Sequence, residues 1–174
     1  MGDEHELILV DEHDRVTGHA EKLLVHQGQP QLHRAFSVVI FNSQGQMLLQ
    51  LRSVKKYHFG GLWSNACCGH PTRSLPIQPA AEQRLHEEFG FRVPLRERFS
   101  FIYQARDPVS GLSEHELDRV YSGRFDGQPQ PNPDEIDQFR WLDLDQLLQD
   151  VASHPQRYTP WFRILLQYPR AQSL

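Results

Sequence analysis

The sequence is short of long apolar runs, of positive charge and of cysteine. No apolar run approaches the ~18 residues that a membrane helix needs, so we expect no membrane span. The formal net charge of −4 does not favour a nucleic-acid surface. With 39% hydrophobic and 23% charged residues, the 174-residue chain is typical of a globular protein, and we expect one domain over residues 1–174.

The two cysteines, Cys67 and Cys68, are neighbours. Adjacent cysteines are poor partners for an ordinary disulfide, so we expect free thiols in a reducing, cytoplasmic setting. Gly69 permits a tight turn, and Pro71 is expected to end a strand. The thiols stand just before His70, which suits either a reactive sulfur beside a metal ligand or a buried structural cysteine with a surface histidine.

Hydrophobic periodicity and turn residues predict a chain of strands with few helices. We expect a β-hairpin over 7–19, a short helix over 21–26, strands over 34–41, 46–52, 62–67, 99–105, 113–125 and 136–141, and helices over 80–90, 142–151 and 159–168. No repeat or linker divides the chain.

Several polar residues have a spacing that suits chemistry, although each also has an ordinary structural explanation. His26 and His33 flank the helix-breaking residues Gly28-Gln29-Pro30, and this seven-residue spacing is by itself a weak indication of a metal site. Glu114 and Glu116 point to one face of a strand, where a metal or a shared proton would relieve their repulsion, but an exposed edge strand is an equal alternative.

Other candidates are equally open. Arg84 and Glu88 share one side of a helix, as a surface ion pair would. Lys56 lies in a basic loop that could bind an anion or simply carry solvated charges. Trp161 could be a packed aromatic residue of the core.

The order of elements resembles the Nudix fold, which implies an α+β, Nudix-type α/β/α sandwich with a mixed central sheet and an extra N-terminal β-hairpin. Nudix hydrolases carry Gly-x5-Glu-x7-Arg-Glu-x2-Glu-Glu-x-Gly, whose glycines and final glutamates fall here on Gly69, Gly90, Glu87 and Glu88. Leu75 replaces the first glutamate, and Gln83-Arg84 replaces Arg-Glu. Because those carboxylates hold the magnesium that activates water in the hydrolases, the departures argue against pyrophosphate hydrolysis.

Further motifs resemble one branch of that fold, the type I isopentenyl diphosphate isomerases. The family motif Asn-x2-Cys-x-His-Pro is matched by residues 65–71, and its Glu-x-Glu by residues 114–116. Two upstream histidines and a tryptophan after proline are matched by His26, His33 and Trp161. The match extends over nearly the whole chain, and its register assigns the reactive thiol to Cys68, leaving Cys67 to packing.

This resemblance implies that isopentenyl diphosphate is isomerised to dimethylallyl diphosphate through a tertiary carbocation. It assigns Glu116 as the acid and Cys68 as the base on opposite sides of the substrate. Tyr103 is expected to assist protonation, and the indole of Trp161 to face the cation.

The resemblance also implies two metal sites and a diphosphate anchor. One Zn²⁺ or Mn²⁺ is expected at a three-histidine, two-glutamate site formed by His26, His33, His70, Glu114 and Glu116. A Mg²⁺ ion is expected to join the substrate diphosphate to Glu88, and the diphosphate contacts match Lys22, Arg52, Lys56 and Arg84. The expected partner is a small isoprenoid diphosphate, with no nucleic acid or membrane, and the chain is expected to be a monomer or a weak homodimer.

Three other functions remain in view. A Nudix-type pyrophosphohydrolase would release phosphate rather than move a double bond. A thiol hydrolase would use Cys68 with His70, but no orienting carboxylate or oxyanion hole is evident. A binding module with a structural metal site would show no turnover.

Overall fold

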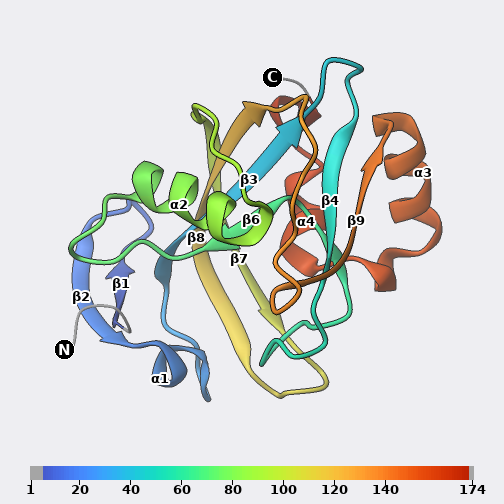
Figure 1. Ribbon diagram of the computed structural model, residues 1–174. Helices are drawn as coiled ribbons and strands as arrows, with labels where there is room; N and C mark the ends of the chain where they lie inside the picture. The colour runs from blue at the N-terminus through green and yellow to red at the C-terminus, as the bar shows by residue number, and fades with distance from the viewer. Residues whose placement is uncertain (1–5, 173–174) are drawn as a thin grey trace.

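The computed structural model describes residues 6–172, which form a curled mixed sheet with helices on both faces (Figure 1). In chain order the elements are β1 (Glu6–Val10), β2 (Val16–Glu21), α1 (Lys22–His26), β3 (His33–Phe41), β4 (Met47–Arg52), β5 (Trp63–Ser64), β6 (Cys67–Gly69), α2 (Ile77–Phe89), β7 (Arg96–Arg106), β8 (Ser113–Arg124), β9 (Ile136–Leu142), α3 (Leu144–Ser153), η1 (Pro155–Arg157), α4 (Pro160–Leu165) and η2 (Pro169–Gln172). None of the helices within residues 6–172 has the length and apolar character needed to cross a bilayer.

The central strand β3 shows why helices cover both faces. Its alternate side chains enter two separate apolar clusters, with Phe36 and Val38 on one face and Val39 and Phe41 on the other. The first cluster packs against α2 and the second against α3 and α4. A strand buried on both faces reads as a nearly continuous apolar run, as β3 does in the sequence. The expected α+β sandwich with an N-terminal hairpin is confirmed.

The strands β3 and β4 form a hairpin but separate beyond their turn. They pair only at Phe41 and Met47. Further along, β3 pairs with β6 and β4 pairs with β5, so residues 63–69 enter between the two diverging strands. This insertion carries both cysteines to the middle of the sheet.

Several expected boundaries were wrong. The expected strand over 62–67 is two short strands, β5 and β6, because its two halves pair with different partners. The helix α2 begins at Ile77 rather than at residue 80, since Pro79 lies in the first turn, where its missing N–H has no helical partner. The last helix is shorter than expected, and α4 ends at Leu165 before turns lead to η2.

Candidate active site

Strand pairing brings three predicted residues onto one face of the sheet. In the parallel pair β3–β8, His33 lies opposite Glu116, and in the antiparallel pair β7–β8, Tyr103 lies opposite Glu116. The Tyr103 hydroxyl donates a 2.6 Å hydrogen bond to Glu116 Oε2. The proposed acid therefore lies between an imidazole and a phenol.

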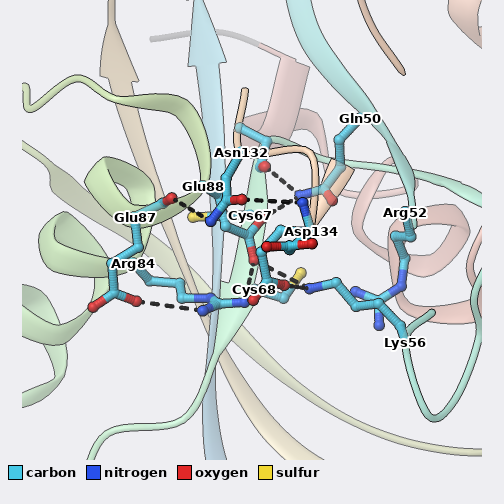
Figure 2. Close-up of polar contacts among 12 residues, drawn as sticks. Gln50, Arg52, Lys56, Cys67, Cys68, Arg84, Glu87, Glu88, Asn132 and Asp134 are labelled. Atoms are coloured by element: carbon cyan, nitrogen blue, oxygen red, sulfur yellow. Dashed lines mark hydrogen bonds and ion pairs between the residues drawn. The ribbon is translucent and has the colours of Figure 1, made fainter. Parts of the chain in front are cut away.

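The two thiols lie on opposite sides of β6 (Figure 2). Cys67 is fully buried in the cluster under α2. Cys68 lies opposite Ser37, whose Oγ is 3.5 Å from Cys68 Sγ, and the Asn65 amide donates to the same sulfur at 3.2 Å. Burial raises the pKa of Cys68 to about 12, so the thiol keeps its proton at neutral pH in the substrate-free protein.

A cluster of imidazoles and carboxylates occupies the same face. One ligand atom from each of His26, His33, His70 and Glu114 lies within 4.8 Å of the others. Glu116 Oε1 completes the group at 2.9 Å from His70 Nε2 and 3.6 Å from His33 Nε2. The structure thus brings together all five residues expected at the His/Glu metal site.

The donor set fits a divalent cation. The Nδ1–H groups of His26 and His33 donate to the carbonyls of Lys22 (2.5 Å) and Gln31 (2.9 Å), which leaves their Nε2 lone pairs facing the cluster. Those lone pairs face carboxylate oxygens of Glu114 at 2.8 and 3.7 Å. Lone pairs facing lone pairs repel unless protons or a cation lie between them, and imidazole with carboxylate suits zinc or manganese.

Hydrogen bonds and burial act in opposite directions on the ionisable groups of this cluster. Burial lowers the pKa of His70 to about 4, so this imidazole is neutral at pH 7. Burial alone would raise the pKa of Glu114, but the His26 and His58 imidazoles against its carboxylate hold it well below its usual value. In the metal-free protein the His26 contact requires a proton on Nε2, at the position that a cation would take. Neutral His70 and ionised Glu114 are the protonation states that bind a metal.

Aromatic groups close the cavity beside the thiol. The Trp161 indole is buried, and its Nε1–H donates to Ser64 Oγ at 3.1 Å, so the ring is fixed from the α4 side. Its centroid lies 6.2 Å from that of Tyr103. The Arg52 guanidinium lies over the indole, 5.2 Å from its centroid.

The four basic residues expected at the diphosphate lie at the same cavity, although not in one cluster. Lys56 and Arg84 extend toward each other from the loop after β4 and from α2 (Figure 2). Arg84 Nη2 is 2.6 Å from Glu88 Oε1, and Lys56 Nζ is 3.3 Å from the same oxygen. Arg84 and Glu88 do form an ion pair, but the alternative of a plain surface pair is wrong, because Glu88 is only 1% exposed.

The other two basic residues are placed separately. Lys22, on α1, lies 5.1 Å above the ring of Tyr57, and burial lowers its pKa. Arg52 donates through Nε to the Phe59 carbonyl at 3.1 Å.

A cavity of about 620 Å³ joins these groups. The cavity is lined by the thiol, by the carboxyl and histidine cluster, by the aromatic residues and by the four basic residues. These lining residues are Cys68, Glu116, Glu114, His70, Tyr103, Trp161, Lys22, Arg52, Lys56 and Arg84. Along β3, the positions opposite Cys68 and Glu116 are four residues apart, on the order of 13 Å. The two side chains thus reach one cavity from well-separated backbone positions, and a small molecule in that cavity would contact both.

Some polar residues of the site were not expected from the sequence. His58 pairs with Glu114, Asp118 accepts a 2.7 Å hydrogen bond from Ser37 Oγ, and Glu135 pairs with Lys56 and Arg84. Asp118 had a usable signal, since it continues the two-residue alternation of Glu114 and Glu116. His58 and Glu135 lie in loops, where no periodicity reveals orientation.

Comparison with known proteins places this chain in a recognised fold family. The family model described as NUDIX domain matches residues 31–162. A solved structure from Deinococcus radiodurans covers 93% of this chain and 97% of its own, with a TM-score of 0.74 and 23% identity. The MutT NUDIX hydrolase from Burkholderia pseudomallei matches 79% of this chain and 97% of its own, with a TM-score of 0.60 and 26% identity. The chain is a Nudix-fold protein.

Relatives identified by sequence define the family more narrowly than the fold does. The chain is 47% identical over 161 residues to the isopentenyl-diphosphate Delta-isomerase of Serratia proteamaculans, covering 92% of this chain and 89% of that protein. It is 46% identical over 163 residues to isopentenyl-diphosphate Delta-isomerase 2 of Aromatoleum aromaticum, covering 94% and 85%. The chain belongs to the isopentenyl-diphosphate Delta-isomerase family.

Proposed function

We propose that this protein converts isopentenyl diphosphate to dimethylallyl diphosphate by moving one double bond. The observation that carries the proposal is that Cys68, Glu116, Tyr103 and Trp161 line one shared cavity, with Lys56 and Arg84 on its wall. Membership of the isomerase family supports the same reaction. The whole chain then acts as one isomerase domain.

The reaction needs one proton added and one removed. Glu116 donates a proton to the terminal alkene carbon, and the Tyr103 hydroxyl, 2.6 Å away, holds the carboxyl group in place and stabilises the carboxylate it leaves. The electron pair of the double bond forms the new C–H bond, which leaves a tertiary carbocation. Cys68 then takes a proton from the adjacent carbon on the diphosphate side, and those C–H electrons form the new double bond.

The base role requires the thiolate form of Cys68. Burial and the charge of Asp118 disfavour that form, whereas hydrogen-bonding contacts with Ser37 and Asn65 and the charge of Arg52 favour it. Before each turnover, therefore, a proton must pass in net from the Cys68 thiol to the Glu116 carboxylate, and the reaction then returns both groups to their starting forms. Trp161 supplies an aromatic face for the cation, worth ~0.5–2 kcal/mol or more when water is excluded.

The metal sites organise these groups. A divalent ion, Zn²⁺ or Mn²⁺, would be held by His26, His33, His70, Glu114 and Glu116. Its positive charge would keep the Glu116 carboxyl group in position. Glu88 would hold Mg²⁺ brought with the diphosphate, and Lys22, Arg52, Lys56 and Arg84 would bind phosphate oxygens. We also propose a cytoplasmic protein, a monomer or weak homodimer, that uses neither membrane nor nucleic acid.

Incubation with isopentenyl diphosphate and Mg²⁺, followed by NMR, tests this function. We expect the dimethylallyl methyl signals to appear without phosphate release. Phosphate release instead would support the pyrophosphohydrolase alternative, which the replacement of Nudix carboxylates by Leu75 and Arg84 disfavours. No turnover of any kind would support a binding module.

A further inference from the structure

The two cations at the basic end of the cavity share two carboxylates. Lys56 Nζ and Arg84 Nη2 each contact Glu88, and each also contacts Glu135 Oε2, with 2.7 Å between Arg84 and that oxygen. Arg84 Nη1 also contacts Glu87 Oε2 at 3.3 Å, so three carboxylates surround the two cations on the cavity wall, and two of them are shared by both cations. A diphosphate that binds these cations has to compete with carboxylates already there.

The two shared carboxylates differ in how firmly they are held. Glu88 is 1% exposed on α2 and also accepts a 2.7 Å hydrogen bond from Gln50. Glu135 lies in the turn before β9, and its side chain is 27% exposed. Its backbone is anchored on both sides, by a hydrogen bond to Asn132 O and one from Ser53 N, so its side chain can swing away without moving the strand.

We propose that the Glu135 carboxylate is an internal stand-in for a phosphate group: it occupies Lys56 and Arg84 in the substrate-free protein and leaves when a diphosphate binds. Carboxylate and phosphate oxygens present the same acceptor geometry to a guanidinium group. The inference rests on the proposed function, because it concerns the residues that bind a diphosphate substrate. It adds to them Glu135, which lies outside α2, the helix that carries Glu87 and Glu88.

The arrangement makes diphosphate binding depend on a divalent cation. Without one, the incoming anion meets Glu88 and Glu135 as well as the two cations that they neutralise. A divalent ion bound with the diphosphate offsets the carboxylate charge and leaves Lys56 and Arg84 available for phosphate oxygens. Glu135 thereby disfavours metal-free diphosphate.

Calorimetric binding of inorganic pyrophosphate, with and without Mg²⁺, tests the proposal on the full chain. We expect Glu135→Gln to tighten Mg²⁺-free pyrophosphate binding by about threefold or more, because one competing charge is removed. The gain in affinity that Mg²⁺ confers should fall by a similar factor. Glu135→Ala should act in the same direction and excludes an effect of the new amide.

Asp134→Asn is the matched control. It removes the same charge one residue away, at the rim of the same cavity, but Asp134 pairs with the exposed Lys55 and not with Lys56 or Arg84, so pyrophosphate affinity should change much less. If Glu135→Gln leaves Mg²⁺-free binding unchanged or weaker, or if Asp134→Asn matches it, the stand-in role is wrong. If the unaltered protein fails to bind pyrophosphate even with Mg²⁺, the diphosphate anchor of the proposed function is contradicted instead.

Discussion

The neighbouring residues Cys67 and Cys68 differ because a strand sends successive side chains to opposite faces. Cys67 packs under α2, whereas Cys68 reaches the cavity with Ser37 and Asn65. The same alternation places Glu114, Glu116 and Asp118 on one face of β8. Chemistry at this site therefore depends on which of two adjacent positions a residue occupies.

Exchange of each thiol tests this assignment. We expect Cys68→Ala to lower kcat by at least about 100-fold, because the proton acceptor is lost. Cys67→Ala should keep most of the activity and lower the free energy of unfolding by about 1 kcal/mol, because it leaves only a small void. Turnover by NMR and urea unfolding measure the two effects. An essential Cys67 beside a dispensable Cys68 would refute the register.

Asp107 gives a prediction on pH. Its carboxylate accepts hydrogen bonds from Phe59 N–H (3.0 Å), Val109 N–H (3.0 Å) and Ser110 Oγ–H (2.7 Å). Burial alone would raise the pKa of Asp107, but these bonds lower it below its usual value. A lowered folded-state pKa stabilises the protein above the unfolded pKa of about 3.9, and this stability is lost as the pH falls through the folded value.

We therefore expect Asp107→Asn to lower the free energy of unfolding by about 1–2 kcal/mol at pH 6. The difference between the two proteins should shrink as the pH is taken below about 3.9. Urea unfolding at several pH values between 6 and 3 measures it, and a difference that grows toward acid would contradict the assignment.

Among the elements, β6 is the one whose exact position the site requires. It inserts between β3 and β4 and has only three residues. A Cβ built on Gly69 would lie 2.7 Å from the Phe36 ring, which is itself buried under α2. The glycine is therefore needed for the close approach of β6 to β3.

Gly69→Ala should push β6 away from β3 and move Cys68 with it. We expect a loss of about 1–3 kcal/mol in the free energy of unfolding from overpacking, together with a fall in kcat. Cys67→Ala is the control, since it weakens the same strand without crowding it. If Gly69→Ala loses stability but turns over like Cys67→Ala, the strand's position does not limit the reaction.

The His/Glu cluster joins parts of the whole molecule that are far apart in the sequence. His26 comes from α1, His33 from β3, His70 from the end of β6, and Glu114 and Glu116 from β8. An ion bound there would link α1 to the sheet. Binding to the folded state alone raises stability, by about 2.7 kcal/mol at 100 times Kd.

Removing metal with a chelator should lower Tm, and adding Zn²⁺ or Mn²⁺ should restore it. His26→Gln should reduce or abolish that Tm shift. His154→Gln should keep the Tm shift, because His154 follows α3 and pairs with Asp150 of that helix, outside the His/Glu cluster. A shift that persists in His26→Gln, or none in the unaltered protein, would contradict metal binding at these residues.

Local patterns were sufficient for much of this protein. Two-residue alternation placed Glu114 with Glu116 and separated Cys67 from Cys68, and the motif around residues 65–71 indicated the family. These features depend on neighbours in the chain, which is why one sequence reveals them. The apolar run of β3 likewise indicated a strand covered on both faces.

Long-range pairing decided the rest. That β3 lies parallel to β8, with His33 opposite Glu116, follows from contacts between segments about 80 residues apart, which no local pattern encodes. The separation of β3 from β4, which split the expected strand over 62–67, arises from competition among several partners. Glu135 forms ion pairs with Lys56 and Arg84 only because the assembled α2, β4 and β9 bring the three residues together. The sequence of an isolated loop does not fix the direction of its side chains.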